Sequence, residues 1–289
     1  MTGVVWELDF YSRPILDENQ KKIWELLVCE SPLDTSQSMD SLFQYAQFCP
    51  NQQVNSIWLR ETIAEAIAKS QQPPEKIRFF RRQMSNMITK ACEELGIQAQ
   101  PSRRTYRIEQ WLKQRIQDVY PKEPGYQAVA AASSFVQYQP QIPQPLPDAL
   151  EYDKWAVVTL EAGAFEEMNE WDIGFSEAFP LSMIGLAPDT RIPGIIIFSS
   201  SRATPLAAWM SGLELAFVKL DSGSPARLLL ETGANDSWIL ATLKGSQTLA
   251  EAQGFELSKQ KAQKVHFLAV QSSPTSESFA GFWLLQEIE

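Results

Sequence analysis

The sequence is poor in histidine and cysteine, the residue types that build many metal and nucleophile sites. It contains one histidine, His266, and three scattered cysteines, Cys29, Cys49 and Cys92. His-rich zinc sites and HExxH metalloproteases are therefore excluded, and a Ser-His-Asp triad would have to be built on His266. Within the apolar run VHFLAV we expect His266 to be a buried, hydrogen-bonded side chain. Three cysteines are too few for a disulfide framework, which indicates a reducing compartment.

The sequence also lacks a hydrophobic run long enough to span a membrane. Its longest apolar stretch, 205–220, carries Glu214 and Lys219 and falls short of the ~20 residues that a span needs. The N-terminal MTGVVWELDF has neither the basic nor the apolar region of a signal peptide. We therefore expect a soluble intracellular protein.

Positive charge is scarce overall and unevenly distributed. The 289 residues include 25 Lys and Arg against 35 Asp and Glu, a net charge of −10, which argues against indiscriminate binding to nucleic acid. The first 140 residues are balanced, at 16 basic and 16 acidic, so the excess acid lies in the rest. Segment 76–122 holds eleven basic and four acidic residues. Such a segment is typical of a polyanion binder, although a solvated face would look the same.

A proline-rich stretch divides the chain. Four prolines fall between residues 140 and 147, a density that favours an extended, semi-rigid spacer. A length near 300 residues also favours two domains. We predict an N-terminal domain over 1–122, a linker over 123–150 and an acidic C-terminal domain over 151–289.

Apolar periodicity predicts that both domains are α/β. In the first half the pattern indicates the order β-β-β-α-β-α-β-α, with strands at 4–15, 22–29, 42–49, 76–83 and 97–100, and helices at 55–69, 84–95 and about 102–119. In the second half it indicates strands at 155–161, 194–199, 227–232, 238–243, 265–271 and 279–286, and helices at 205–219 and 246–261.

The order in the first half is similar to the ribonuclease H-like fold, whose first strand holds a metal-binding acid near its middle. Asp9 lies at the matching place, and Glu61 or Glu65 could come from the first helix. Two-metal chemistry needs several convergent carboxylates. The fourth strand ends in Arg81 and Arg82 instead, and their positive charge would repel a metal. We therefore expect a non-catalytic relative of the fold, without a cofactor or a metal.

The second half offers a rival set of acids. Glu161 and Glu231 end predicted strands just before small, flexible residues, and Glu214 lies between them in the sequence. Carboxylates in such places can converge on a hard cation. With 19 acidic residues in this half, we expect these three to be surface or helix-capping acids.

Basic residues interleaved with aromatic ones are the best candidates for function. They lie in KIRFFRR (76–82) and SRRTYR (102–107) and in the helix that follows. An arginine guanidinium matches phosphate and stacks on bases, and an aromatic platform contributes ~1–3 kcal/mol per stacked base. We expect the neighbouring phenylalanines to be core. The predicted RNA-binding residues, which we expect to form one exposed patch, are Arg78, Arg81, Arg82, Arg103, Arg104, Arg107, Lys113 and Arg115.

Several short motifs spread over residues 4–286 resemble one family. They are WELDFYSRP (6–14), CPN with VN (49–51 and 54–55), RFFRRQM (78–84), PSRRT (101–105), IPG (192–194), GLE (212–214), RLLLETG (227–233) and GFWLL (281–285). Together they resemble the Tab2/Atab2 family of cyanobacteria and chloroplasts. The resemblance implies a non-catalytic RNA-binding factor that supports translation of photosystem I reaction-centre mRNA and photosystem biogenesis.

The family signature is a C-terminal Trp-Leu-Leu, which corresponds here to Trp283, Leu284 and Leu285. In a terminal strand this composition is more typical of a core than of an RNA contact, so we expect Trp283 to support the fold. Since no transit peptide precedes Val4, the chain looks like the cyanobacterial, cytoplasmic form.

Two other functions remain open on the sequence. One is a metal-dependent nuclease that uses either acid set. The other is a protein-interaction scaffold for photosystem assembly, in which the acidic second domain docks a basic translation or assembly factor.

Overall fold

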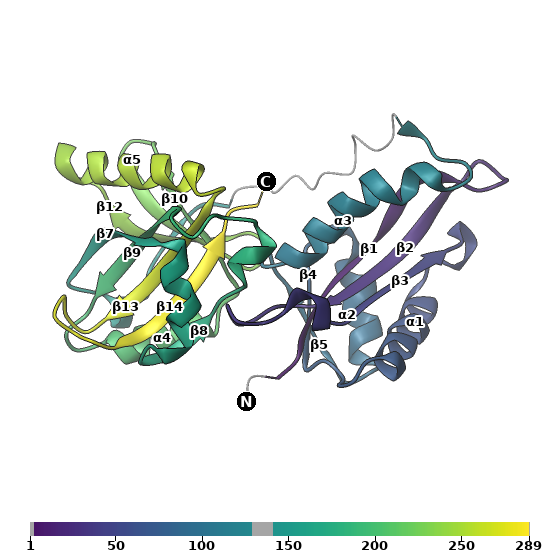
Figure 1. Ribbon diagram of the computed structural model, residues 1–289, viewed down its shortest axis with the longest axis horizontal. Coiled ribbons are helices and arrows are strands. Elements are labelled where there is room, and N and C mark those ends of the chain that lie inside the picture. Colours follow the sequence, from purple (N-terminus) through teal and green to yellow (C-terminus); the bar gives the residue numbers. More distant parts are fainter. Residues whose placement is uncertain (1–2, 129–140, 289) are drawn as a thin grey trace. The chain divides into compact units, whose positions relative to one another are not determined.

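The computed structural model describes residues 3–128 and 141–288, which form two compact units. Among the described residues, unit 1 comprises 3–31 and 41–128, and unit 2 comprises 32–40 and 141–288. The segment 32–40, which we call the strap, therefore leaves unit 1 between two of its strands and belongs to unit 2. Both units are mixed α/β structures (Figure 1).

Unit 1 is built on a five-stranded sheet in the order β3-β2-β1-β4-β5. The first three strands are antiparallel neighbours, whereas β4 pairs in parallel with β1, and β5 with β4. Its elements are β1 (Val5–Leu16), β2 (Lys22–Glu30), β3 (Gln44–Cys49), η2 (Asn51–Gln53), α1 (Ser56–Lys69), β4 (Lys76–Phe79), η3 (Arg82–Met84), α2 (Ser85–Glu93), β5 (Gln98–Pro101), α3 (Tyr106–Asp118) and η4 (Tyr120–Lys122).

The two faces of this sheet differ in chemistry because side chains alternate along β1. Trp6, Leu8 and Phe10 point to the face covered by α1 and α2, where they join a wholly apolar core. The residues between them, Glu7 and Asp9, belong to the other face, where Glu7 accepts from the backbone N–H of Ile108 in α3. Figure 1 shows α3 running along this sheet. Alternation along a strand places every second residue on one face, so charged groups gather beneath α3.

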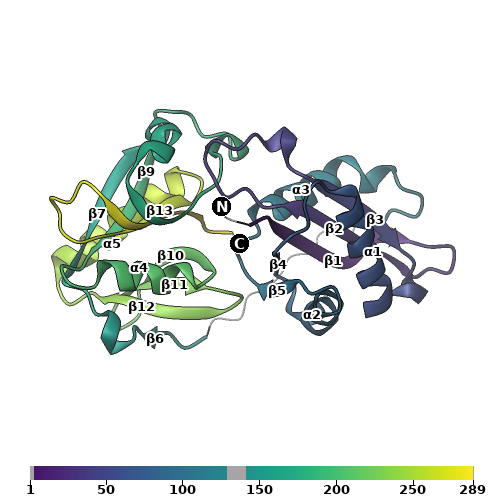
Figure 2. The same cartoon turned by 90° about the horizontal axis from the view of Figure 1, so that it is seen from below.

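Unit 2 contains two sheets that share one core. The sheets have the orders β10-β11-β12-β6 and β7-β9-β13-β14-β8, and β6 runs beside β12 (Figure 2). The elements are η1 (Met39–Ser41) at the end of the strap, β6 (Gln144–Pro145), η6 (Asp148–Leu150), β7 (Lys154–Glu161), η7 (Ala162–Glu170), β8 (Ile173–Glu177), η8 (Leu181–Met183), β9 (Arg191–Phe198), α4 (Ala203–Ser211), β10 (Leu215–Asp221), β11 (Arg227–Thr232), β12 (Asp236–Thr242), α5 (Ser246–Lys261), β13 (Val265–Gln271) and β14 (Phe279–Gln286).

The strap is held to unit 2 by hydrogen bonds. The backbone N–H of Ala178 donates to the carbonyl of Leu33 at 3.2 Å, and Asn169 Nδ2 lies 3.1 Å from Asp34 Oδ1 and 3.1 Å from Ser36 Oγ. A segment from the first seventh of the chain is therefore an integral part of the second unit.

The α/β class and the order of elements in unit 1 are confirmed, but the second half departs from the prediction. The predicted helix 205–219 is wrong, because α4 ends at Ser211 and β10 begins at Leu215. Gly212 closes the helix, and the apolar residues after it pair with β11 instead. β8 was not predicted, and strand 76–83 ends at Phe79.

The predicted linker is described only at its two ends, since residues 129–140 lie outside the described chain. Its last part, 141–150, packs against unit 2, where Leu150 joins the core. The three cysteines are all buried and free. No helix in the described residues is long and apolar enough to cross a membrane.

We expect Gly281→Ala to destabilise unit 2. A Cβ at Gly281 would lie 2.3 Å from the ring of the buried Trp283 and 3.0 Å from the Cβ of Ala207, so the packed ring would have to shift. Overpacking of this kind costs ~1–3 kcal/mol. The free energy of unfolding, measured by urea denaturation with far-UV circular dichroism, should fall by that amount.

Gly254→Ala is the matched control. Gly254 lies within α5, and a Cβ added there would have nothing within 4 Å of it. Alanine in a helix is favoured over glycine by ~0.5–1 kcal/mol, so this variant should be slightly more stable than the parent. Equal stability of the two variants would contradict the packing argument.

Candidate nucleic-acid interface

The basic residues predicted to bind RNA lie around α3 and the sheet face beneath it. On that face β1 presents Glu7, Asp9 and Arg13, and β2 presents Glu25. In the parallel pairing of β1 with β4, Glu7 lies opposite Arg78. The basic segment therefore meets a set of carboxylates within its own unit.

Asp9 and Glu25 are the centre of a buried ion network. Arg13 donates from Nη1 to Asp9 Oδ2 at 2.8 Å and from Nε to Glu25 Oε2 at 2.9 Å. Arg81 donates to Asp9, and Arg115 donates to Glu25. Both carboxylate side chains are fully buried. Five charged groups thus satisfy one another away from water.

These contacts decide the ionisation of the network. Burial favours the neutral form of Asp9, but the charges of Arg81 and Arg13 outweigh it and hold the pKa of Asp9 below its ordinary value. The Tyr120 hydroxyl donates to Glu25 at 2.5 Å, and burial raises the pKa of that hydroxyl. Asp9 therefore stays ionised and paired at neutral pH.

Glu7 connects the sheet to the start of α3. Its carboxylate accepts hydrogen bonds from Ser31 Oγ and from the backbone N–H of Ile108, both at 2.8 Å. Burial raises the pKa of Glu7 to about 7 even though both hydrogen bonds lower it. A backbone donor in the first turn of α3 is satisfied in this way.

Arg107 anchors both ends of the strap. Its guanidinium donates to the carbonyl of Glu30, at the end of β2, at 2.8 Å and to the carbonyl of Leu42, just before β3, at 3.1 Å. One buried side chain therefore fixes the points at which the chain leaves unit 1 and returns to it.

The expected exposure of the eight predicted residues is wrong for most of them. Five are at most 6% exposed, namely Arg78, Arg81, Arg103, Arg104 and Arg107. Arg115 is 13% exposed through its side chain, whereas Arg82 and Lys113 are exposed. The structure thus gathers these residues around one sheet face, but mainly as buried partners. Their contact with RNA stays a prediction.

Sequence reasoning missed Arg13, Glu7 and Glu25. Arg13 and Glu7 lie in the first strand, whose other residues are mostly apolar, and Glu25 lies in KIWELLVC. Charged side chains are rarely buried unless they are paired, so acids in a strand predicted to be buried were a signal that some of the arginines are structural.

The first metal set does not assemble. Asp9 is bound by Arg13 and Arg81, while Glu61 pairs with Arg60 and Glu65 with Lys69 on the exposed side of α1. The guanidinium groups of Arg13 and Arg81 bind the Asp9 carboxylate, which a metal would need as a ligand.

In the second set, Glu231 accepts from Ser237 Oγ at 2.8 Å and pairs with Lys219 at 3.0 Å. Throughout residues 3–128 and 141–288, no group of three or more His, Cys, Asp or Glu side chains is arranged to hold a metal.

The Trp-Leu-Leu of β14 is part of the core of unit 2. Trp283 is 3% exposed and Leu284 and Leu285 are fully buried. Trp283 and Leu285 contribute to the core shared by the two sheets. This placement agrees with the expectation that Trp283 supports the fold.

His266 is a structural residue, as expected. Its Nε2 accepts from the backbone N–H of Val218 at 2.8 Å, and Nδ1 lies 3.0 Å from the carbonyl of Lys264. Burial lowers its pKa well below the ordinary value. The ring is therefore neutral and both nitrogens are engaged.

The fold and its arginine network define a two-unit mixed α/β protein with a cationic helix over a sheet. Comparison with known proteins identifies the family. Residues 5–115 match the family model described as "RNA-binding protein Tab2/Atab2 N terminal", and residues 133–286 match the one described as "RNA-binding protein Tab2/Atab2, C-terminal domain". The chain belongs to the Tab2/Atab2 family.

Two plant relatives cover nearly the whole chain. The chain is 40% identical to "Protein TAB2 homolog, chloroplastic" of Arabidopsis thaliana over an alignment of 290 positions, which covers 98% of the chain and 74% of that protein. It is 38% identical to the protein of the same name from Zea mays, again over 98% of the chain and over 71% of the relative. The resemblance drawn from the sequence motifs is confirmed.

We expect Asp9→Ala to destabilise unit 1 strongly. The change leaves Arg13 and Arg81 buried without their shared carboxylate, and breaking a buried pair costs ~3–5 kcal/mol. Urea denaturation with far-UV circular dichroism would measure the loss. The control is Glu61→Ala, whose carboxylate pairs with Arg60 at an exposed site and should contribute below ~1 kcal/mol. Similar small losses in both variants would argue against the network.

The pKa of Glu7 predicts a pH dependence of stability. Between its ordinary pKa of 4.5 and about 7, the folded chain holds a proton on Glu7 that the unfolded chain has released. Stability is therefore full below pH 4.5 and falls as the pH rises through 7, by a total on the order of 3 kcal/mol. Urea denaturation at a series of pH values should show this slope, and Glu7→Gln should flatten it. An unchanged slope in the variant would show that Glu7 ionises normally.

Proposed function

We propose that this chain binds RNA and supports translation of photosystem mRNA, specifically that of the photosystem I reaction centre, and so supports photosystem biogenesis. The observation that carries the proposal is that both halves of the chain match the models of an RNA-binding family. The plant relatives are named chloroplastic. A cytoplasmic location for this chain stays a prediction.

In our proposal the RNA lies against α3 of unit 1. Unit 1 has 16 basic and 14 acidic residues, whereas unit 2 has nine basic and 21 acidic, so phosphates favour unit 1. Arg82 at the start of η3 and Lys113 of α3 are exposed, and they would contact phosphates. The buried arginines among the eight predicted residues would hold α3 and the sheet in place.

Glu109 strengthens the positive charge near Lys113. Burial raises the pKa of Glu109 to about 8, although Lys113 lowers it. At neutral pH the Glu109 carboxyl is therefore mostly protonated and does not cancel the charge of Lys113. The patch should lose positive charge above pH 8, where Glu109 ionises.

The buried ion network around Asp9 supports a non-catalytic role. The acid in the middle of β1, Asp9, is buried and bound by Arg13 and Arg81. Two-metal phosphoryl chemistry needs convergent carboxylates that are open to a metal. This observation favours RNA binding over the nuclease alternative.

The double variant Arg82→Ala with Lys113→Ala tests the interface. If each side chain contacts one phosphate of single-stranded RNA, the slope of log affinity against log salt concentration should fall by about 1.4. Fluorescence anisotropy with a labelled RNA from the reaction-centre message would measure it. The RNA should be recovered intact after incubation with Mg²⁺ or Mn²⁺.

The control is Lys21→Ala with Lys90→Ala, which removes the same charge from exposed positions in the β1–β2 hairpin and on α2. Its salt slope should match that of the parent. Equal losses in both double variants, or none in either, would reject the assignment of the interface to α3. Failure of the parent chain to bind any RNA would reject the proposed function itself.

A further inference from the structure

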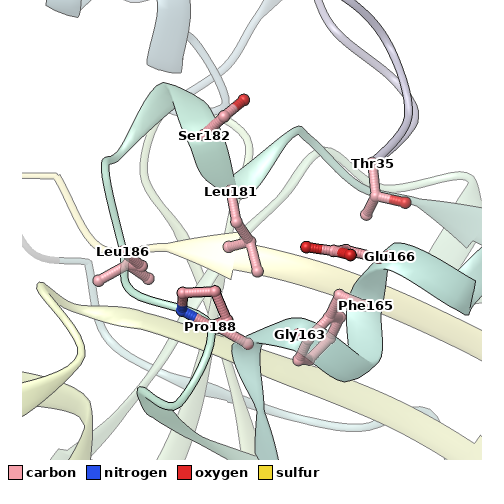
Figure 3. Close-up of a pocket in the computed structure, with 9 residues that line it drawn as sticks. Thr35, Gly163, Phe165, Glu166, Leu181, Ser182, Leu186 and Pro188 are labelled. Atoms are coloured by element: carbon pink, nitrogen blue, oxygen red, sulfur yellow. The ribbon is translucent and has the colours of Figure 1, made fainter.

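Unit 2 contains a pocket of about 280 Å³ between the strap and two loops that follow strands of its larger sheet. Thr35 of the strap borders the pocket, η7 contributes Phe165 and Glu166, and Leu181 and Pro188 form the opposite side. In Figure 3 the Glu166 carboxylate points toward Leu181, in the space between Thr35 and Pro188. The pocket thus combines aliphatic and aromatic walls with one carboxylate.

The loops around the pocket are held in place without a ligand. The N–H of Gly163 donates to the carbonyl of Pro188 at 2.8 Å, which joins η7 to the facing loop. Asn169 donates to Asp34 and Ser36 of the strap. Burial would raise the pKa of Asp34, but hydrogen bonds from Ser36 and Asn169 outweigh it and lower that pKa. Hydrogen bonds therefore join all three segments.

The carboxylate of the pocket would bind a ligand that donates hydrogen bonds. An ionised glutamate such as Glu166 only accepts hydrogen bonds. The Thr35 hydroxyl oxygen is buried from solvent, so Glu166, an exposed residue, supplies the carboxylate that an occupant can reach. Leu181 and Pro188 offer aliphatic surface beside this carboxylate. A suitable occupant has a donor-rich head on an aliphatic stem.

The charge around the pocket selects a cation. The stretch 155–190, which supplies both loops, contains seven Asp and Glu and no Lys, Arg or His. The strap adds two aspartates and no basic residue. Unit 2 as a whole has nine basic against 21 acidic residues. RNA phosphates would be repelled here, which favours a basic protein segment over a nucleic acid.

We propose that this pocket receives an arginine side chain from a basic segment of a partner protein. Its guanidinium would pair with the Glu166 carboxylate, with its methylene stem against Leu181 and Pro188. Arginine fits better than lysine because its planar fork can donate two parallel hydrogen bonds to one carboxylate. The pocket thereby gives unit 2 a protein partner in addition to the RNA proposed for unit 1.

Three labelled peptides of identical length test the proposal, with arginine, lysine or the neutral isostere citrulline alternating with glycine. Fluorescence anisotropy with the full chain should give the tightest binding for the arginine peptide. Glu166→Gln should weaken that binding at least tenfold. Glu167→Gln removes the same charge from an exposed neighbour that does not line the pocket, and it should change the affinity less than twofold.

Circular dichroism should show that each variant is folded. RNA binding through unit 1 should be the same in the parent and in Glu166→Gln, so a failure here is distinct from a failure of the RNA proposal.

Three results would overturn the proposal. In the first, the arginine peptide binds no better than the citrulline peptide. In the second, Glu166→Gln and Glu167→Gln weaken its binding equally, which would indicate diffuse charge attraction. In the third, guanosine monophosphate or single-stranded RNA competes with the peptide in the parent but not in Glu166→Gln, which would make the pocket a nucleobase site.

Discussion

The structure of unit 1 depends on the pairing of two buried carboxylates with three arginines. Asp9 and Glu25 lie on adjacent strands of the sheet, and Arg13, Arg81 and Arg115 reach them from β1, from the end of β4 and from α3. Isolated charges could not be buried there, since each would lose its hydration. On this face of the sheet, α3, β1 and the chain that follows β4 are therefore joined by ion pairs, beside an apolar cluster that includes Ile108 and Leu112 of α3. On the other face, α1 and α2 are held by apolar packing.

Most of unit 1 could be predicted from the sequence because its elements carry their own periodic signals. The stripe of α2 and the alternation of β1 are visible in the residues themselves. The second half was less predictable at 205–219, where α4 and β10 follow each other with three residues between them. A continuous apolar run suits a buried helix and a buried strand equally well. Only the pairing of β10 with β11, the next strand along the chain, distinguishes the two. The likeness of unit 1 to the ribonuclease H-like fold stays a prediction drawn from the order of its elements.

The exposure of the candidate residues was not predictable from the sequence. The sequence analysis expected Arg78, Arg81 and Arg107 in one exposed patch, and all three are buried. Whether such an arginine faces RNA or a carboxylate depends on residues far away in the sequence, since Arg81 is 72 positions from Asp9 and Arg115 is 90 positions from Glu25. The composition gives the number of charged residues but not which of them pair. Two basic residues of segment 76–122, Arg81 and Arg115, pair with acids of β1 and β2, which precede that segment in the sequence.

The pairing of charges within unit 1 also bears on how one chain can carry two surfaces of opposite charge. Because the arginines of unit 1 are mostly consumed within the unit, its surface charge rests on a few exposed cations such as Lys113, whose neighbour Glu109 is kept mostly neutral by burial. In unit 2 the stretch 155–190 contains seven acidic and no basic residues, so its composition is acidic. An RNA and a basic protein would bind each other in solution, but on this chain they would be directed to different units. Charge separated in this way would let the protein hold an RNA and a basic protein at the same time, without a conformational change to choose between them.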